Sequence, residues 1–129
     1  MLNPTTAPLK IAIVGLGYVG LPLAVEFGKE FPVVGFDTLQ QRVNELNAKY
    51  DRTHETSVEQ LEAARQLKYS ANPEDLHDCN VFIVTVPTPV DTANCPDLSM
   101  VINASQTVGR AMRKNALVIY ESTVYPGVT

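Results

Sequence analysis

Three glycines and one acidic residue near the start of the chain have types and spacing that suit dinucleotide binding. Gly15, Gly17 and Gly20 form a GxGxxG motif. In this motif the first glycine permits a tight turn, the second lets a pyrophosphate approach the backbone, and the third lets a helix pack closely on a sheet. Asp37 follows at close to the roughly 20-residue spacing at which a carboxylate meets the adenosine ribose. Because a carboxylate accepts hydrogen bonds from ribose hydroxyls and repels a 2′-phosphate, the pattern predicts NAD rather than NADP.

The glycines also have a purely architectural interpretation, in which they only shape the corner of a strand–helix–strand unit. Their surroundings favour binding: residues 11–14 predict a strand, a helix-length stretch follows the motif, and residues 32–36 predict a second strand that Asp37 closes. The helix would present unpaired N–H groups and the positive end of its dipole to the phosphates. Pro22 fits this helix only near its first turn, where a missing N–H is tolerated.

The rest of the chain continues the alternation of helices and strands, which predicts an α/β fold with a Rossmann-like, doubly wound parallel sheet in a single domain. Residues 81–86 and 116–120 are apolar runs typical of strands buried on both faces, and residues 67–70 suit a short edge strand. The helical segments are expected over residues 39–50, 57–64, 72–79 and 97–115.

Apolar spacing predicts the buried faces of three of these helices. Ser57 and Gln60 suit a capping box at the start of the second, and Asp97 suits the N-cap of the third. The residues expected to face the core are Leu39, Val43, Leu46 and Tyr50 in the first helix, Val58, Leu61 and Ala64 in the second, and Leu98, Val101, Ile102, Ser105, Val108 and Met112 in the third.

Ligands of a doubly wound sheet bind outside the carboxyl ends of its strands. Three segments follow strands at that edge: the glycine turn at residues 15–20, the rigid Pro87-Thr88-Pro89 turn, and residues 121–123. We therefore expect these segments to meet at one edge of the sheet.

Composition excludes several other classes of function. With 129 residues, 45% apolar residues and a net charge of −4, the chain suits one soluble domain and carries no cluster of Lys and Arg for nucleic acid. It has no apolar run approaching the ~20 residues of a membrane span and no secretion signal. We expect a cytoplasmic protein without membrane or nucleic-acid partners, with a disordered leader at residues 1–8 and one domain at residues 9–129.

Cys79 and Cys95 form no metal-ligand pattern, since the chain has no CxxC motif and only two histidines. We interpret both as free thiols, with Cys79 packing beside a buried strand. A disulfide between them would be unusual in the cytoplasm.

Three motifs taken together resemble the UDP-glucose/GDP-mannose dehydrogenase family. They are GLGYVGLPLA with Asp37, VTVPTPVD with PDLSMV, and YESTVYPGVT. Within the family the chain looks most like the bacterial enzymes that oxidise UDP-N-acetylhexosamines to uronic acids for surface polysaccharides. The resemblance covers nearly the whole chain from Lys10 to Thr129 and implies that it is the NAD-binding part of such an enzyme.

The resemblance also implies roles for particular residues. Arg42 would help hold the adenosine end of NAD, its alternative being a solvated charge on a helix face. Thr123 would contact the cofactor near the nicotinamide and position a water, its alternative being a hydroxyl that satisfies local backbone, as Ser122 could. The implied cofactor-binding residues are Gly15, Leu16, Gly17, Tyr18, Val19, Gly20, Asp37, Arg42, Val86, Pro87, Thr88, Ser122 and Thr123. Val90 replaces a threonine of many members and receives no role, and none is assigned to Glu55 or Glu121.

The reaction implied by the resemblance is a two-step oxidation of an alcohol to an acid with two NAD molecules in turn. It needs a nucleophilic cysteine, a lysine and a glutamate, which in the family lie in later parts of a longer chain. Cys95 does not substitute, because no base lies near it in the sequence. The sequence stops where a further helix would begin, so we expect a part of a longer, homodimeric enzyme that lacks its central and C-terminal domains. Alone, it would bind NAD without turnover.

Two other functions stay open on the sequence alone. One is a free-standing module that senses or buffers NAD, which downstream sequence with a cysteine and a lysine would exclude. The other is a different reductase, such as a hydroxyacid or 6-phosphogluconate-like dehydrogenase, against which the PTPVD and ESTVYPG motifs argue. The identity of the sugar is not predicted.

Overall fold

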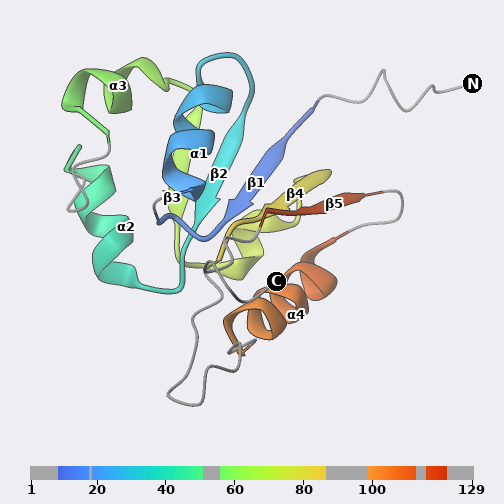
Figure 1. Cartoon of the computed structure of the whole chain (residues 1–129). Coiled ribbons are helices and arrows are strands. Elements are labelled where there is room, and N and C mark those ends of the chain that lie inside the picture. The colour runs from blue at the N-terminus through green and yellow to red at the C-terminus, as the bar shows by residue number, and fades with distance from the viewer. Residues whose placement is uncertain (1–8, 18, 51–55, 87–98, 113–115, 122–129) are drawn as a thin grey trace, which may run out of the picture.

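The protein is described by a computed structural model that places residues 9–17, 19–50, 56–86, 99–112 and 116–121. These residues form a five-stranded sheet in the order β3-β2-β1-β4-β5, with every neighbouring pair parallel (Figure 1). The predicted doubly wound, Rossmann-like sheet is thus confirmed. The strands are β1 (Ile11–Val14), β2 (Val33–Phe36), β3 (Leu67–Ser70), β4 (Val81–Val84) and β5 (Leu117–Tyr120). The helices are α1 (Gly20–Gly28), α2 (Gln40–Asn47), α3 (Val58–Ala63), the 3-10 helix η2 (Pro73–Leu76) and α4 (Ser99–Ala111).

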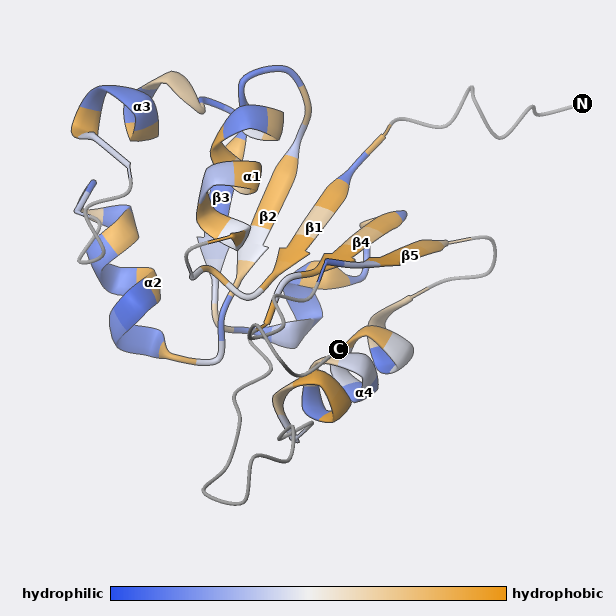
Figure 2. Ribbon diagram, viewed as in Figure 1, coloured by the Kyte–Doolittle hydropathy of each residue, from blue (hydrophilic) through white to orange (hydrophobic). Residues whose placement is uncertain are grey.

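Alternate residues of the central strand belong to two separate cores, one on each face of the sheet. Ile11 and Ile13 pack with residues of α1, α2 and α3, whereas Ala12 and Val14 pack with residues of η2 and α4. Figure 1 shows α1 and α4 on opposite sides of the sheet, and Figure 2 shows the apolar residues concentrated in the strands between them. Both faces of the central strands are covered, which explains their continuous apolar sequences.

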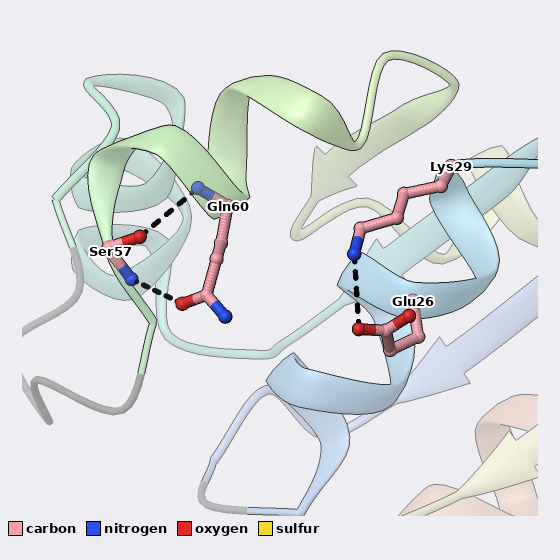
Figure 3. Close-up of polar contacts among 4 residues, drawn as sticks. All are labelled: Glu26, Lys29, Ser57 and Gln60. Carbon is pink, nitrogen blue, oxygen red and sulfur yellow. Dashed lines mark hydrogen bonds and ion pairs between the residues drawn. The ribbon is translucent and has the colours of Figure 1, made fainter.

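Local sequence signals set the beginning of two short helices. Before α3, Ser57 Oγ accepts a hydrogen bond from the Gln60 N–H at 3.2 Å, and Gln60 Oε1 accepts one from the Ser57 N–H at 2.8 Å (Figure 3). This reciprocal pair is the predicted capping box. Before η2, Asn72 Oδ1 accepts from the Glu74 N–H at 3.0 Å. The edge position predicted for residues 67–70 is also confirmed, because β3 ends the sheet.

The buried face of α4 differs from the predicted one except at Val108, which is buried as expected. Ala104, Val108 and Ala111 are buried against the sheet and η2, whereas Ile102 is 52% exposed and Met112 is exposed too. Alanine lets a helix approach a sheet closely, so the contact face carries the smaller side chains. The positions of the large apolar residues therefore did not predict which side of α4 faces the sheet.

The prediction that residues 116–120 form a strand buried on both faces is wrong. β5 is the last strand in the sheet order, and Leu117, Ile119 and Tyr120 are exposed. Val118 packs against the core on the α4 side. An edge strand has a neighbour on one side only, so its apolar composition alone did not reveal its position.

Three residues predicted to face the core at helix ends are exposed: Leu39, Tyr50 and Val58. Leu39 precedes α2, Tyr50 follows it, and Val58 is the first residue of α3, so each lies where the chain leaves the packed part of the helix. The other predicted core residues of these helices, Val43, Leu46, Leu61 and Ala64, are buried as expected.

Several predicted features lie outside the described residues. They are the leader at 1–8, the turn at 87–89, the Asp97 cap with Leu98, and the end of the third helix at 113–115.

Candidate dinucleotide site

The glycine turn follows β1 and is packed between the ends of β2 and β4. Gly15 has a φ of +105°, which side chains disfavour, and a Cβ there would lie 3.0 Å from Val86 Cγ1. Its N–H donates to the Phe36 carbonyl of β2 at 2.8 Å. A Cβ on Gly20 would overlap the Gly15 carbonyl oxygen and the Thr85 hydroxyl. The first and third glycines are therefore required by close packing, as the motif predicted.

Gly17 and the beginning of α1 fit an anionic ligand instead. A Cβ on Gly17 would meet no described atom within 4 Å, so the backbone there borders open space. The first turn of α1 carries no acidic residue, and Val19 at its N-cap makes no side-chain capping bond. The positive end of the helix dipole is thus left for a pyrophosphate. Pro22 is the third residue of α1, within the group of N–H positions that lack helical partners, as expected.

Asp37 lies directly after β2, beside the glycine turn. Its Oδ2 accepts a hydrogen bond from the Leu16 N–H at 3.0 Å, and its Oδ1 accepts one from the Leu39 N–H at 3.0 Å. These two hydrogen bonds fix the direction of the carboxylate. Because Asp37 is only half-buried, its carboxylate is also open to a ligand. This geometry suits an acceptor for ribose hydroxyls.

Arg42 is not a solvated charge on the surface of α2. Its side chain is only 5% exposed, and its Nε donates to the Leu16 carbonyl at 2.8 Å. The guanidinium therefore ties α2 to the glycine turn. The Leu16 side chain is itself buried in the α1-side core, so Leu16 borders the site through its backbone.

Thr85 belongs to the site, although sequence analysis placed it only within a strand. β4 ends at Val84, and Thr85 is 5% exposed with its Oγ1 at 2.7 Å from the Gly15 carbonyl and 3.1 Å from the Val14 carbonyl. Because threonine is common in any β-branched strand, the type of residue at this position did not indicate a contact with the glycine turn. The one feature that could have indicated this contact is the position of Thr85 at the end of its strand, because parallel pairing places that end beside the glycine turn.

Of the three segments predicted to meet at this edge, the structure places most of the glycine turn and Glu121, whereas residues 87–89 lie outside the described residues. The Thr85 N–H donates to the Val14 carbonyl at 2.9 Å, and the Glu121 N–H donates to the Val84 carbonyl at 2.8 Å. Val86 contacts the glycine turn, and Glu121 is exposed at the same edge. The predicted residues Tyr18, Pro87, Thr88, Ser122 and Thr123 lie outside the described residues, as do Glu55, Val90 and Cys95.

Cys79 lies apart from this edge and is a free thiol in the core beneath η2 and α4. Burial raises the pKa of this thiol from 9.0 to about 11, so it is protonated at neutral pH and suits packing rather than chemistry. Within the described ranges, no three His, Cys, Asp or Glu side chains gather as metal ligands. None of the helices in those ranges has the length and apolar character to span a bilayer.

Comparison with known proteins decides the family. Residues 9–129 match the model of the NAD-binding domain of the UDP-glucose/GDP-mannose dehydrogenase family. The chain belongs to this family. As one of its NAD-binding domains, it takes NAD as its cofactor, and the alternative of a different reductase family is set aside. The open backbone at Gly17, the uncapped start of α1 and the Asp37 carboxylate fit that cofactor.

Relatives in the family are similar over nearly all of this chain. A UDP-N-acetyl-D-glucosamine 6-dehydrogenase of Pseudomonas aeruginosa is 55% identical over 94% of the chain, and Protein CapL of Staphylococcus aureus is 49% identical over 92%. The solved UDP-D-ManNAc dehydrogenase of Pyrococcus horikoshii superposes with a TM-score of 0.84 at 38% identity over 94% of the chain. The chain spans 29%, 28% and 30% of the length of these three proteins.

Proposed function

We propose that the chain is the cofactor-binding part of a nucleotide-sugar 6-dehydrogenase, and that Asp37 makes it selective for NAD over NADP. In this role the glycine turn and the start of α1 hold the pyrophosphate, and Asp37 holds the adenosine ribose. The observation that carries the proposal is the Asp37 carboxylate, fixed at 3.0 Å by the Leu16 N–H of the glycine turn and still open to a ligand. A 2′-phosphate at that position would meet a negative charge that cannot turn away.

Titration calorimetry of the 129-residue chain with NAD and NADP tests this assignment. We expect saturable NAD binding, much weaker NADP binding, and a loss of NAD affinity of about tenfold in Asp37→Ala, as for one lost charge-assisted hydrogen bond. Asp37→Asn is the matched variant, because it keeps the size of the side chain and one oxygen acceptor, removes the charge, and replaces the second acceptor oxygen with an NH2 donor. It should therefore raise NADP affinity relative to NAD. Equal binding of both dinucleotides by the wild-type chain would contradict the proposal.

We further propose that the parent enzyme oxidises the C6 alcohol of a UDP-sugar to the uronic acid for surface-polysaccharide synthesis, as a cytoplasmic homodimer. The 55% identity to a UDP-N-acetyl-D-glucosamine 6-dehydrogenase supports this substrate class. Thr123 and Ser122 would then border the nicotinamide, with Thr123 positioning a water, and Tyr18, Pro87 and Thr88 would line the cofactor. When bound, NAD accepts hydride. The residues of this chain would hold it in place.

This proposal also implies that the chain alone binds NAD without turnover, because the family's nucleophilic cysteine and lysine lie in later parts of a longer chain. Mixing the 129-residue chain with NAD and UDP-N-acetylglucosamine should yield no NADH absorbance, while calorimetry on the same sample still detects NAD. A full-length relative under identical conditions serves as the positive control. Steady NADH production by the chain alone would contradict the proposal.

A further inference from the structure

The peptide group between Gly15 and Leu16 is held at both of its ends. In a trans peptide the C=O and N–H point in opposite directions, and no described peptide bond is cis. The Gly15 carbonyl oxygen lies 2.7 Å from Thr85 Oγ1, on the β4 side. The Leu16 N–H donates to Asp37 Oδ2 at 3.0 Å, on the β2 side. One peptide plane therefore links the Thr85 hydroxyl to the carboxylate proposed to bind the ribose.

The Thr85 hydroxyl is placed to determine how this peptide is rotated. Gly15 has a φ of +105°, and as a glycine it has no side chain to limit the rotation of the adjoining peptide. Thr85 is anchored, since it is buried and its N–H donates to the Val14 carbonyl at 2.9 Å. Its hydroxyl has one hydrogen to donate, and the shorter of its two contacts is to Gly15.

We propose that Thr85 is a positioning residue for the dinucleotide site: it fixes the Gly15–Leu16 peptide and, through the Leu16 N–H, the direction of the Asp37 carboxylate. This inference rests on the proposed binding of NAD at Asp37. Without the hydroxyl, the Gly15 carbonyl loses its buried donor and the peptide is free to rotate. The Leu16 N–H then turns from Asp37, which keeps only its bond to the Leu39 N–H. The carboxylate becomes less well placed to accept from a ribose and to repel a 2′-phosphate.

Thr85→Val is the test variant, because it keeps the branched shape of the side chain and replaces only the hydroxyl with a methyl group. We expect it to weaken NAD binding about tenfold, as for one buried hydrogen bond, and to lower the ratio of NAD to NADP affinity. Thr85→Ser keeps the hydroxyl and should stay within about twofold of the wild type. In hydrogen-exchange NMR without cofactor, the Leu16 amide should exchange faster in Thr85→Val than in Thr85→Ser.

Val108→Ala is the control for a general loss of stability, since Val108 lies in α4 and is buried against the face of the sheet opposite α1. It should lower the melting temperature and leave the NAD to NADP ratio unchanged. An equal change of the ratio in Val108→Ala and Thr85→Val would overturn the inference. If Thr85→Val does not fold, Thr85→Cys replaces it, because a thiol is a weaker donor than a hydroxyl. The ratio should then fall from threonine and serine to cysteine.

The outcomes separate this inference from the proposed function. If the wild-type chain binds NAD and Thr85→Val, or Thr85→Cys in its place, binds both dinucleotides as the wild type does, the inference is overturned and the proposed function stands. If the folded wild-type chain does not bind NAD, the proposed function fails and the inference fails with it.

Discussion

At the scale of single residues, the three glycines of the motif do different work although their side chains are identical. Gly20 is packed so tightly that a Cβ would overlap the Gly15 carbonyl and the Thr85 hydroxyl, whereas a Cβ on Gly17 would meet nothing within 4 Å. Gly20 is thus a structural requirement of the turn. Gly17 is required only if a ligand approaches the backbone there.

This difference predicts opposite behaviour of two alanine variants. Gly20→Ala should destabilise the fold by about 1–3 kcal/mol or more, because a rigid backbone carbonyl would have to move. Gly17→Ala should keep the wild-type melting temperature and lose NAD affinity, because its methyl group would occupy the approach of the pyrophosphate. Thermal unfolding and NAD titration of both variants measure the two effects. NAD binding by Gly17→Ala as tight as the wild type would show that the open space at Gly17 does not face the cofactor.

The polar residues at this edge differ in how much of their role could be predicted from the sequence. Asp37 was predicted at the end of the second strand, and that position is confirmed. Arg42 was assigned to the adenosine end by resemblance, and its bond to the Leu16 carbonyl could not be predicted, because it depends on how α2 packs against the turn. Thr85 was missed for a related reason. Its hydroxyl has a function only through a contact 70 residues away in the sequence.

At the scale of elements, the sequence predicts where a helix begins more reliably than which of its faces is buried. The capping box of Ser57 and Gln60 was predicted and found, since it depends on residues three positions apart. The predicted buried face of α4 is wrong except at Val108, because apolar periodicity does not distinguish a large exposed residue such as Ile102 from a small buried one such as Ala104. Which side packs is decided by the space between β4, η2 and the helix, and that space is a tertiary property.

The position of a strand in the sheet order is another tertiary property. Residues 81–84 and 117–120 are both apolar runs, yet β4 is nearly fully buried in the interior of the sheet and β5 is mostly exposed at its edge. The sequence of β5 carries none of the charges or prolines that often mark an edge strand. Its apolar character therefore gave no sign that one of its sides is unpaired within the described residues.

At the scale of the whole molecule, the two cores give the sheet a stable centre and a weaker edge at β5. β1 contributes buried residues to both cores, whereas β5 contributes only Val118, partly buried, to one of them. Opening β5 would expose little apolar surface, and opening β1 would disrupt both cores. Local unfolding should therefore begin at β5.

Hydrogen exchange offers a matched comparison of centre and edge. Thr85 directly follows β4, and its N–H donates to the carbonyl of Val14, the last residue of β1, at 2.9 Å. Glu121 directly follows β5, and its N–H donates to the carbonyl of Val84, the last residue of β4, at 2.8 Å. Because the hydrogen bonds are equivalent, a difference in exchange reports the stability of the surrounding structure. We expect Thr85 to exchange only on global unfolding, at a cost of about 5–15 kcal/mol for a domain of this kind.

Glu121 should exchange through local opening of β5, at a lower free energy and with little dependence on denaturant, because little surface is exposed in that event. The Leu117 amide, which donates to the Asn80 carbonyl at 2.9 Å, should behave like Glu121. Native-state exchange at increasing urea concentrations measures both quantities for each amide. Equal free energies and equal denaturant slopes at Thr85, Leu117 and Glu121 would contradict this prediction and mean that β5 unfolds only with the rest of the sheet.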